Sequence, residues 1–349
     1  MIAITICSTR SYAYALIAQA RKIQASIERE SGGFLILVGD NSPEIRSVTK
    51  FYQTILPASW KTEMFTGKYE DGLKNYKNPA QLIIAQMRSV AFDRARQLNV
   101  DYCWSLDSDV LPPPNALRVM KQMLEFDDGF YSISTCPYPS QGGGAFLGGR
   151  GTPEHPILPD FYDDEREIPP KLKTRIRHHQ KRLETLKGKP DEKWKKELQL
   201  VSAEVKKCRP VGNIFYCNSK HYRRRGWLDA AYPGIGLGSV VPSDWCGFGC
   251  TLMNRRALAL AQFEGYDGSG TEDLYVVWKK WHRSGLKINV IPHAPCDHVI
   301  RDMQNKGKFI LCQAYHDTRN PETVGHLRIE QRPWYQQTDG ETYYGPPRD

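Results

Sequence analysis

Short apolar runs and longer amphipathic segments alternate along the first third of the chain. The runs 2–7, 34–38 and 102–106 are mostly apolar, as expected for strands that are buried on both faces of a parallel sheet. The segments 11–30 and 80–98 instead carry apolar residues three and four positions apart, which predicts helices. Strands and helices in this order predict an α/β fold with a parallel sheet and right-handed crossovers.

The middle of the chain predicts a basic helical hairpin. Helical patterns over 167–187 and 191–207 meet at a Gly-Lys-Pro turn, which favours an antiparallel pair inserted into the main domain. Residues 165–207 hold 14 Lys and Arg against 7 Asp and Glu, and the whole chain has a net charge of +9. This local excess indicates a polyanionic partner, either nucleic acid or an anionic membrane surface. A solvated hairpin kept soluble by its lysines is the alternative.

After the hairpin the pattern returns to strands and one helix. Strands are expected near 211–217, within 244–256 and over 287–291, and a helix over 271–284. The last fifty residues hold few long apolar runs, so we expect them to wrap around the domain as a tail.

Composition limits the class of protein. With 349 residues and 40% hydrophobic content, the chain can form one large α/β domain with additions, or two domains. It has no run of about 18 apolar residues that would span a membrane, and its start resembles a strand more than a signal peptide. The nine cysteines are scattered singly, which indicates reduced thiols in a cytoplasmic protein and argues against a disulfide framework or a zinc site.

Two carboxylates, Asp107 and Asp109, directly follow the strand 102–106. The carboxyl edge of a parallel sheet is where open α/β folds bind ligands. Paired carboxylates hold hard divalent cations, and such a cation can grip a diphosphate. The alternatives are a polar strand end or an N-cap for a helix that begins near Asn115.

The order of these features resembles the GT-A glycosyltransferases, in particular their large inverting group that uses nucleotide-diphosphate sugars. The matching features are a first strand, a second strand ending in Asp40, a third ending in Asp107 and Asp109, a Gly-rich strand running into Arg255-Arg256, Glu272-Asp273 at a helix start, and His298 after a further strand. The resemblance covers about residues 2–300 without the hairpin. It implies a GT-A fold, which is a Rossmann-like, mostly parallel sheet flanked by helices, here with the inserted basic hairpin.

The resemblance also implies roles for individual residues. The residues expected to contact the nucleotide sugar are Thr9, Arg10, Asp40, Arg88 and Asp107. The expected ligands of a divalent Mn or Mg ion are Asp109, Asp107 and His298. Members of the family usually carry a further acidic residue two positions after the Glu-Asp pair, where this chain has Tyr275.

Asp273 is the expected catalytic base, with Glu272 orienting the acceptor. The acceptor hydroxyl must lose its proton as it attacks the sugar, and one nearby carboxylate suffices for this step. An ordinary helix start at Thr271 is the alternative, because acidic residues are favoured there. His298 as a ligand depends mainly on the resemblance, since a single histidine at a strand edge is usually structural.

The acceptor side is expected to involve aromatic and basic residues. Trp245 and Phe248 either form a stacking platform or belong to the core. The basic residues expected there are Arg223, Arg224, Arg225, Lys171, Arg175 and Arg177.

These observations divide the chain into four parts. The expected parts are a nucleotide-sugar and metal-binding half (1–160), the basic hairpin (161–210), an acceptor and catalytic half of the same domain (211–300) and a C-terminal extension (301–349).

The expected activity is metal-dependent transfer of a sugar from a nucleotide-diphosphate sugar to an acceptor hydroxyl. Some family members associated with phage DNA modification glycosylate hydroxymethylated DNA bases, and a basic hairpin suits such an acceptor. A saccharide or lipid-linked acceptor at a membrane surface is the main alternative. A non-catalytic nucleic-acid-binding protein of this fold stays open, whereas Cys7-Ser8-Thr9-Arg10-Ser11 fits a nucleotidyltransferase poorly. The sequence does not define the sugar, the nucleotide or the oligomeric state.

Overall fold

The computed structural model describes residues 1–67, 69, 79–139, 148–149, 170–185, 191–207, 215–218, 223–226, 241–268, 270–301, 309–317, 326–334, 337–338 and 342–343.

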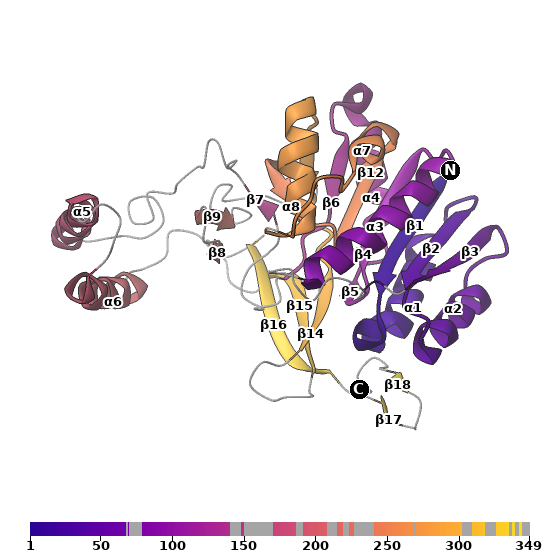
Figure 1. Cartoon of the computed structure of the whole chain (residues 1–349), viewed down its shortest axis with the longest axis horizontal. Helices are drawn as coiled ribbons and strands as arrows, with labels where there is room; N and C mark the ends of the chain where they lie inside the picture. The colour runs from indigo at the N-terminus through magenta and orange to yellow at the C-terminus, as the bar shows by residue number, and fades with distance from the viewer. Residues whose placement is uncertain are drawn as a thin grey trace.

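A central sheet of eight strands organises the main body (Figure 1). In order across the sheet the strands are β3 (Trp60–Thr66), β2 (Gly33–Gly39), β1 (Ile2–Ser8), β4 (Tyr102–Asp107), β12 (Cys250–Asn254), β6 (Ile133–Thr135), β13 (Ile288–Val290) and β10 (Val241–Ser243). The strands β3, β2, β1 and β4 are mutually parallel, as the early strand–helix alternation predicts. The strand β12 runs antiparallel to both β4 and β6, whereas β13 is parallel to β6 and β10 is antiparallel to β13.

Helices cover both faces of this sheet. The helical segments of the main body are η1 (Arg10–Ala15), α1 (Leu16–Ser26), α2 (Pro43–Ile55), α3 (Pro79–Gln97), α4 (Ala116–Glu125), η2 (Phe126–Gly129), α7 (Arg255–Leu260), α8 (Glu272–Val276), η3 (Val277–Trp281) and η4 (His282–Ser284). Successive residues of a strand point to opposite faces, so Ile4 joins one core with α1, α2 and α4, and Ala3 joins the other with α3, α7 and η3. The strands are therefore buried on both sides, which explains their continuous apolar runs.

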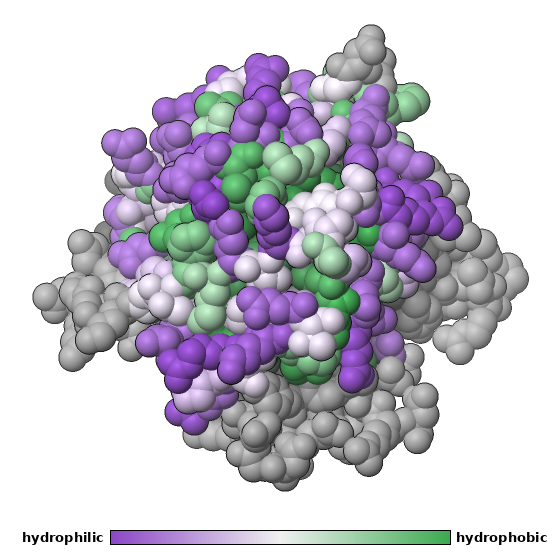
Figure 2. Space-filling view, turned by 90° about the vertical axis from the view of Figure 1, so that its right-hand side faces the viewer, coloured by the Kyte–Doolittle hydropathy of each residue, from purple (hydrophilic) through white to green (hydrophobic). Residues whose placement is uncertain are grey.

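Local signals explain α2, a helix that was not among the expected elements. The side chain of Ser42 accepts a hydrogen bond from the Ile45 amide at 3.4 Å, and Pro43 occupies the first turn of α2. A serine cap followed by proline is a common helix start. The edge strand β3 follows this helix. On the side of the molecule shown in Figure 2, polar residues interrupt the apolar ones, as expected for a solvent-facing surface.

A second sheet lies beside the carboxyl edge of β4. Its strands, in order, are β16 (His326–Trp334), β15 (Phe309–Asp317), β14 (Asp297–Arg301) and β5 (Val110–Leu111). All its pairings are antiparallel, and His298 of β14 lies opposite Val110 of β5. The C-terminal extension therefore contains two long paired strands, which its weak apolar pattern did not predict.

Short strands complete the described structure. They form three two-stranded pieces: β7 (Gly148–Gly149) with β11 (Trp245–Cys246), β8 (Phe215–Asn218) with β9 (Arg223–Gly226), and β17 (Gln337–Thr338) with β18 (Thr342–Tyr343). The strand expected near 211–217 thus corresponds to β8, which pairs with β9 and not with the central sheet.

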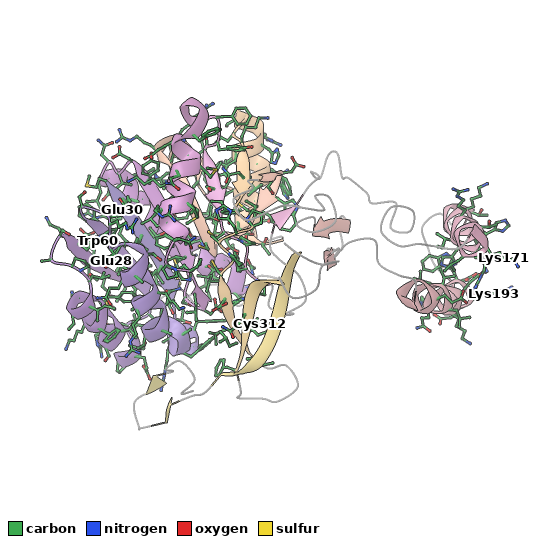
Figure 3. The ribbon with its side chains drawn as sticks, turned by 180° about the vertical axis from the view of Figure 1, so that it is seen from behind. Glu28, Glu30, Trp60, Lys171, Lys193 and Cys312 are labelled. Atoms are coloured by element: carbon green, nitrogen blue, oxygen red, sulfur yellow. The ribbon has the colours of Figure 1, made fainter. Side chains whose placement is uncertain are left out.

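The predicted hairpin consists of α5 (Pro170–Thr185) and α6 (Glu192–Lys207), and it lies apart from the sheets in Figure 1. Leu172 and Ile176 of α5 and Val201 of α6 are buried. The rings of His179 and Trp194 stack with centroids 4.3 Å apart, and Trp194 Nε1 donates to the His179 carbonyl at 3.1 Å. Figure 3 shows Lys171 and Lys193 on the two helices, far from Cys312 in the second sheet.

The predicted fold class is confirmed: a mostly parallel sheet in the Rossmann-like half, flanked by helices, with an inserted helical hairpin. Among the described residues, none of the helices combines the length and apolar character that crossing a bilayer requires.

Candidate functional site

The carboxyl ends of β1, β2 and β4 bring the predicted nucleotide-contacting residues to one edge. Cys7 pairs with Asp107, and Ser8 pairs with Gly39, so Thr9, Asp40 and Asp107 follow or end neighbouring strands. The Asp40 carboxylate accepts hydrogen bonds from the Arg10 amide at 2.8 Å and from the Ser42 amide at 3.2 Å. These bonds hold the segment after β1 against the segment after β2.

The side chain of Arg10 is exposed beside this loop. Its Nε atom lies 2.8 Å from Glu44 Oε1, and 68% of its side-chain surface is accessible to solvent. The predicted nucleotide-contacting residues Thr9, Arg10 and Asp40 are therefore together at the sheet edge, and the Arg10 side chain remains open to solvent.

Arg88 of α3 connects the two acidic motifs. Its Nη2 atom lies 2.5 Å from Asp107 Oδ1, and its Nη1 atom lies 2.6 Å from Glu272 Oε1. Arg88 Nη1 has no hydrogen-bond partner, so the second contact is a close approach of the two groups and not a hydrogen bond. The guanidinium also lies 5.0 Å above the Phe248 ring. Arg88 is thus enclosed between carboxylates and an aromatic face, and its side chain is only 5% exposed.

Burial has the largest effect on the pKa of the two carboxylates that face Arg88. It raises the pKa of Glu272 to about 8, although Arg88 opposes the shift. Burial also raises the pKa of Asp107, again against Arg88, and the neighbouring Asp109 adds to the increase. Removing a carboxylate from water disfavours its charged form, and only a close cation offsets this. A cation beside Asp107 and Asp109 would therefore relieve an unfavourable concentration of negative charge.

Asp109 and His298 form the second half of the predicted metal site. His298 Nε2 lies 3.3 Å from Asp109 Oδ1, and the Tyr14 hydroxyl donates to Asp109 Oδ2 at 3.1 Å. His298 Nδ1 lies 2.6 Å from the carbonyl oxygen of Pro139, so Nδ1 must carry the proton. This tautomer leaves Nε2 to face the carboxylate, which is the usual orientation of a metal-binding histidine.

Two carboxylates and one imidazole fit a divalent cation such as Mn²⁺ or Mg²⁺. Burial lowers the pKa of His298, but Asp109 outweighs this effect, and the net shift is upward. When it is protonated, His298 compensates the charge of Asp109 in the way that a bound cation would.

A glycine pair allows the acidic motifs to approach each other. A Cβ atom at Gly249 would lie 2.4 Å from Tyr138 Cζ and 2.8 Å from Asp107 Oδ2. A Cβ atom at Gly247 would lie 2.3 Å from the Tyr138 oxygen and 3.2 Å from Asp273 Oδ2. The Gly249 amide donates to that oxygen at 2.9 Å. The buried Tyr138 hydroxyl thus lies between Asp107 and Asp273, and side chains at 247 or 249 would displace it.

Asp273 sits at the start of α8 with one oxygen anchored. The Thr271 hydroxyl and the Leu274 amide both donate to Oδ1, at 2.5 and 2.7 Å. Its Oδ2 atom faces the Gly247 backbone. Glu272 is 4% exposed and directed at Arg88, so its carboxylate does not face an acceptor in solvent as expected.

The aromatic residues expected on the acceptor side belong to the core. Trp245 is 2% exposed and Phe248 is 0% exposed, and both are part of the cluster on the α3 face of the sheet. Phe248 packs against Phe92 and Trp281. A ring enclosed in this way cannot stack on an acceptor, so the core alternative describes both residues.

The basic residues expected on the acceptor side lie on two different elements. Lys171, Arg175 and Arg177 are on α5, where Arg175 pairs with Glu204 of α6 at 2.6 Å. Arg223, Arg224 and Arg225 lie in β9, and their side chains are outside the described part of the structure. The structure therefore joins the predicted donor, metal and base residues at one sheet edge and leaves the hairpin residues apart from it.

Sequence reasoning missed Tyr14 and Tyr138. Tyr14 lies in the helical segment after β1, and no spacing relates it to Asp109, which is 95 positions away. The Gly247-Phe248-Gly249 pattern was a usable signal for Tyr138, because paired glycines in a strand often mark a close approach.

No protein-family model matches this sequence, and no curated protein is similar to it. Solved structures with a related architecture include A197 from STIV, with 11% identity, a TM-score of 0.38 and coverage of 86% of this chain and 85% of that chain. GalNAc-T7 with UDP, GalNAc and Mn²⁺ has 12% identity, a TM-score of 0.43 and coverage of 85% and 43%. The mannosyltransferase PcManGT from Pyrobaculum calidifontis in complex with GDP-Man and Mn²⁺ has 12% identity, a TM-score of 0.29 and coverage of 46% and 37%. This chain spans less than half the length of the latter two chains.

Proposed function

We propose that this chain transfers a sugar from a nucleotide-diphosphate sugar to an acceptor hydroxyl, with inversion and with the help of a divalent cation. The observation that carries the proposal is the convergence of Asp107, Asp109, His298 and Asp273 at one edge of an α/β sheet. The order of the strands and motifs along the chain agrees with the GT-A resemblance. Solved structures of similar architecture include one named as a mannosyltransferase with GDP-Man and Mn²⁺.

The donor would lie along the carboxyl ends of β1, β2 and β4. Asp40 and the exposed Arg10 side chain would contact the nucleotide, together with Thr9, which follows β1. Asp109, Asp107 and His298 would hold the cation. When bound, that cation neutralises charge that develops on the departing diphosphate. Arg88 holds Asp107 in place, and Glu272 in turn holds Arg88.

Asp273 would activate the acceptor. Its Oδ1 atom is fixed by two donors, so Oδ2 remains as the oxygen that accepts the proton of the attacking hydroxyl. Asp273 faces Gly247 and Asp107 faces Gly249, so the two carboxylates border the same short segment. A base on the opposite side of the sugar from the leaving group gives inversion.

The first experiment identifies the donor. Nucleotide sugars are screened for stabilisation of the chain against heat, with and without Mn²⁺, because a ligand that binds only the folded state raises the melting temperature. We expect one donor to stabilise the protein only when Mn²⁺ is present. The Asp109→Asn variant should lose this manganese-dependent part, whereas Asp273→Asn should keep it and lose at least 100-fold in turnover, on the order of a general-base contribution.

Asp93→Asn is a matched control for these variants. Asp93 lies on α3, is 57% exposed and pairs with Arg96, away from the acidic cluster. This variant should behave as the parent protein. Full turnover in exhaustive chelator would reject the metal-dependent mechanism, and full turnover of Asp273→Asn would remove Asp273 as the base.

For the acceptor we propose a hydroxymethylated base in DNA. The support is the basic hairpin, whose residues Lys171 and Arg177 are exposed, together with the general preference of clustered Lys and Arg for phosphate. Action in the cytoplasm is part of this proposal. The test measures DNA binding against salt concentration, and then sugar transfer to hydroxymethylated DNA.

Binding should weaken steeply as salt rises, and Lys171→Glu with Lys193→Glu should reduce both binding and the salt slope without changing donor hydrolysis. Binding that is insensitive to salt would reject the DNA acceptor. Sedimentation of the chain with anionic liposomes, lost in the same variant, would instead support a lipid-linked acceptor at a membrane surface.

A further inference from the structure

Three cysteines that are distant in the sequence meet in the core, close in sequence to segments that line the acidic cluster. The sulfur atoms of Cys136, Cys250 and Cys296 all lie within 4.8 Å of one another, and each residue is 0% exposed. Cys136 follows β6, Cys250 begins β12 and Cys296 precedes β14. Among the described residues, this is the group of three ligating side chains that is compact enough to hold a metal ion.

The spacing of the three sulfur atoms suits a thiolate-bound cation. Zinc–sulfur bonds are about 2.3 Å long, so sulfurs around one ion lie about 3.8–4.0 Å apart. The observed limit of 4.8 Å requires a contraction of less than about 1 Å at each sulfur, which side-chain rotation supplies. Soft thiolate ligands select thiophilic ions, in particular Zn²⁺ and Cu(I), over Mn²⁺ or Mg²⁺. The cysteine site would therefore bind a different class of ion from the carboxylate site of Asp107 and Asp109.

Backbone hydrogen bonds already hold the three segments together. The Cys136 amide donates to the Cys250 carbonyl at 3.0 Å, and the Cys296 amide donates to the Pro137 carbonyl at 2.8 Å. The three thiols are thus brought together by the fold itself, and a bound ion would not require the chain to rearrange.

We propose that Cys136, Cys250 and Cys296 form a structural site for a thiophilic cation of the Zn²⁺ or Cu(I) class. Each coordinating thiol gives its proton to solvent as the ion binds, and no electron is transferred. Since the site is closed to solvent, the ion enters during folding and exchanges slowly afterwards. This inference goes beyond the proposed function and does not depend on it.

The position of the site explains what it would stabilise. Each cysteine is next to a segment that shapes the acidic cluster: Cys136 is two residues before Tyr138, Cys250 follows Gly249, and Cys296 is two residues before His298. An ion bound by the three cysteines would hold these three segments together. The carboxylate site of Asp107 and Asp109 would then keep its geometry when its own cation leaves.

The experiment measures metal in the full chain, purified under reducing conditions without added metal. After exhaustive dialysis against EDTA, elemental mass spectrometry should find about one zinc or copper ion per chain, and this ion should leave only when guanidinium unfolds the protein. The element found distinguishes Zn²⁺ from Cu(I). Cys250→Ser and Cys296→Ser should each lower the bound metal at least tenfold.

Cys103→Ser is the matched control. Cys103 is equally buried, but its sulfur lies 3.9 Å from the Thr5 hydroxyl and outside the cluster. This variant should keep the full metal content. Because a cysteine variant can fail to fold, the parent protein is also refolded with Co²⁺ or with Cu(I). Cobalt bound by thiolates gives a near-ultraviolet charge-transfer band that cobalt bound by carboxylates does not give.

Three results would overturn the inference. One is a folded parent chain that holds no chelator-resistant metal after refolding with zinc, copper(I) or cobalt. Another is unchanged metal content in Cys250→Ser. The third is a disulfide between any two of the three cysteines in the purified protein, detected by mass spectrometry after alkylation of free thiols.

Discussion

The contact between Gly247 and the Tyr138 hydroxyl offers a sharp test of the site geometry. A Cβ atom at position 247 would lie 2.3 Å from the Tyr138 oxygen. The next contacts, Asp273 Oδ2 at 3.2 Å and Tyr138 Cζ at 3.3 Å, are tight but need only small shifts of those side chains. Gly247 does not have a positive φ, so alanine fits the backbone there. Overpacking of a buried site costs about 1–3 kcal/mol, so we expect Gly247→Ala to destabilise the fold by this amount.

Removing the hydroxyl should relieve that clash. Tyr138→Phe alone loses the hydrogen bond from the Gly249 amide, and a buried donor without a partner costs about 1–3 kcal/mol. In the double variant the 2.3 Å contact no longer exists, so its destabilisation should equal that of Tyr138→Phe alone. The coupling energy of the cycle is then about 1–3 kcal/mol in the stabilising direction.

Gly249→Ala is the contrasting case. A Cβ atom there would lie 2.4 Å from Tyr138 Cζ and 2.8 Å from Asp107 Oδ2, and both atoms remain in Tyr138→Phe. The phenylalanine variant should therefore not rescue Gly249→Ala.

The assay is urea unfolding followed by circular dichroism, with free energies from linear extrapolation. If Gly247→Ala and Tyr138→Phe add within about 0.5 kcal/mol, the inferred position of the hydroxyl between the acidic motifs is refuted. Equal rescue of both glycine variants would refute it as well.

Three further predictions concern charge and packing. Arg88→Met should destabilise the fold by about 3–5 kcal/mol and weaken manganese binding, because it removes the buried cation that faces Glu272 and holds the proposed ligand Asp107. Calorimetry measures both effects. In chelator, the His298–Asp109 pair should stabilise the fold below pH about 6.5, and this stabilisation should be lost as the pH rises through the raised pKa of His298. His298→Gln should flatten that part of the plot of unfolding free energy against pH, and an unchanged plot would contradict the pairing. Trp194→Ala should destabilise the hairpin by about 1 kcal/mol and speed amide hydrogen exchange in α5 and α6 only. Faster exchange in the central sheet as well would contradict the expectation that the hairpin unfolds independently of the sheet.

Local pattern was sufficient for β1, β2 and β4 and for the helices α1 and α3, whereas α2 and β3 of the same half were not expected. The strands around Ile4, Ile36 and Trp104 were predictable because burial on both faces leaves them continuously apolar. The hairpin was predictable for the same kind of reason, since Leu172 and Ile176 repeat at helical spacing. The helix α2 was also within reach, because Ser42 caps it and the buried Ile45, Val48 and Tyr52 repeat at helical spacing.

The candidate site was only partly accessible from the sequence. Asp107 and Asp109 were found because they end a buried strand. Asp273 was chosen through the family resemblance and the need for a base, and its place at a helix start was the alternative interpretation. Their common location was expected only through the resemblance to a family. The burial of Phe248 under Arg88 was not predictable, because an aromatic residue between glycines has the same pattern in a surface platform and in a core.

The amino-acid sequence by itself determined the alternation of strands and helices, and hence the edge at which the carboxylates of the first half gather. Only the tertiary structure decided which distant residues meet them: His298 reaches Asp109 through the pairing of β14 with β5, and three single cysteines become one cluster. The physical reason is range. Apolar periodicity and capping act between residues a few positions apart, whereas strand pairing and core packing select partners over more than a hundred positions.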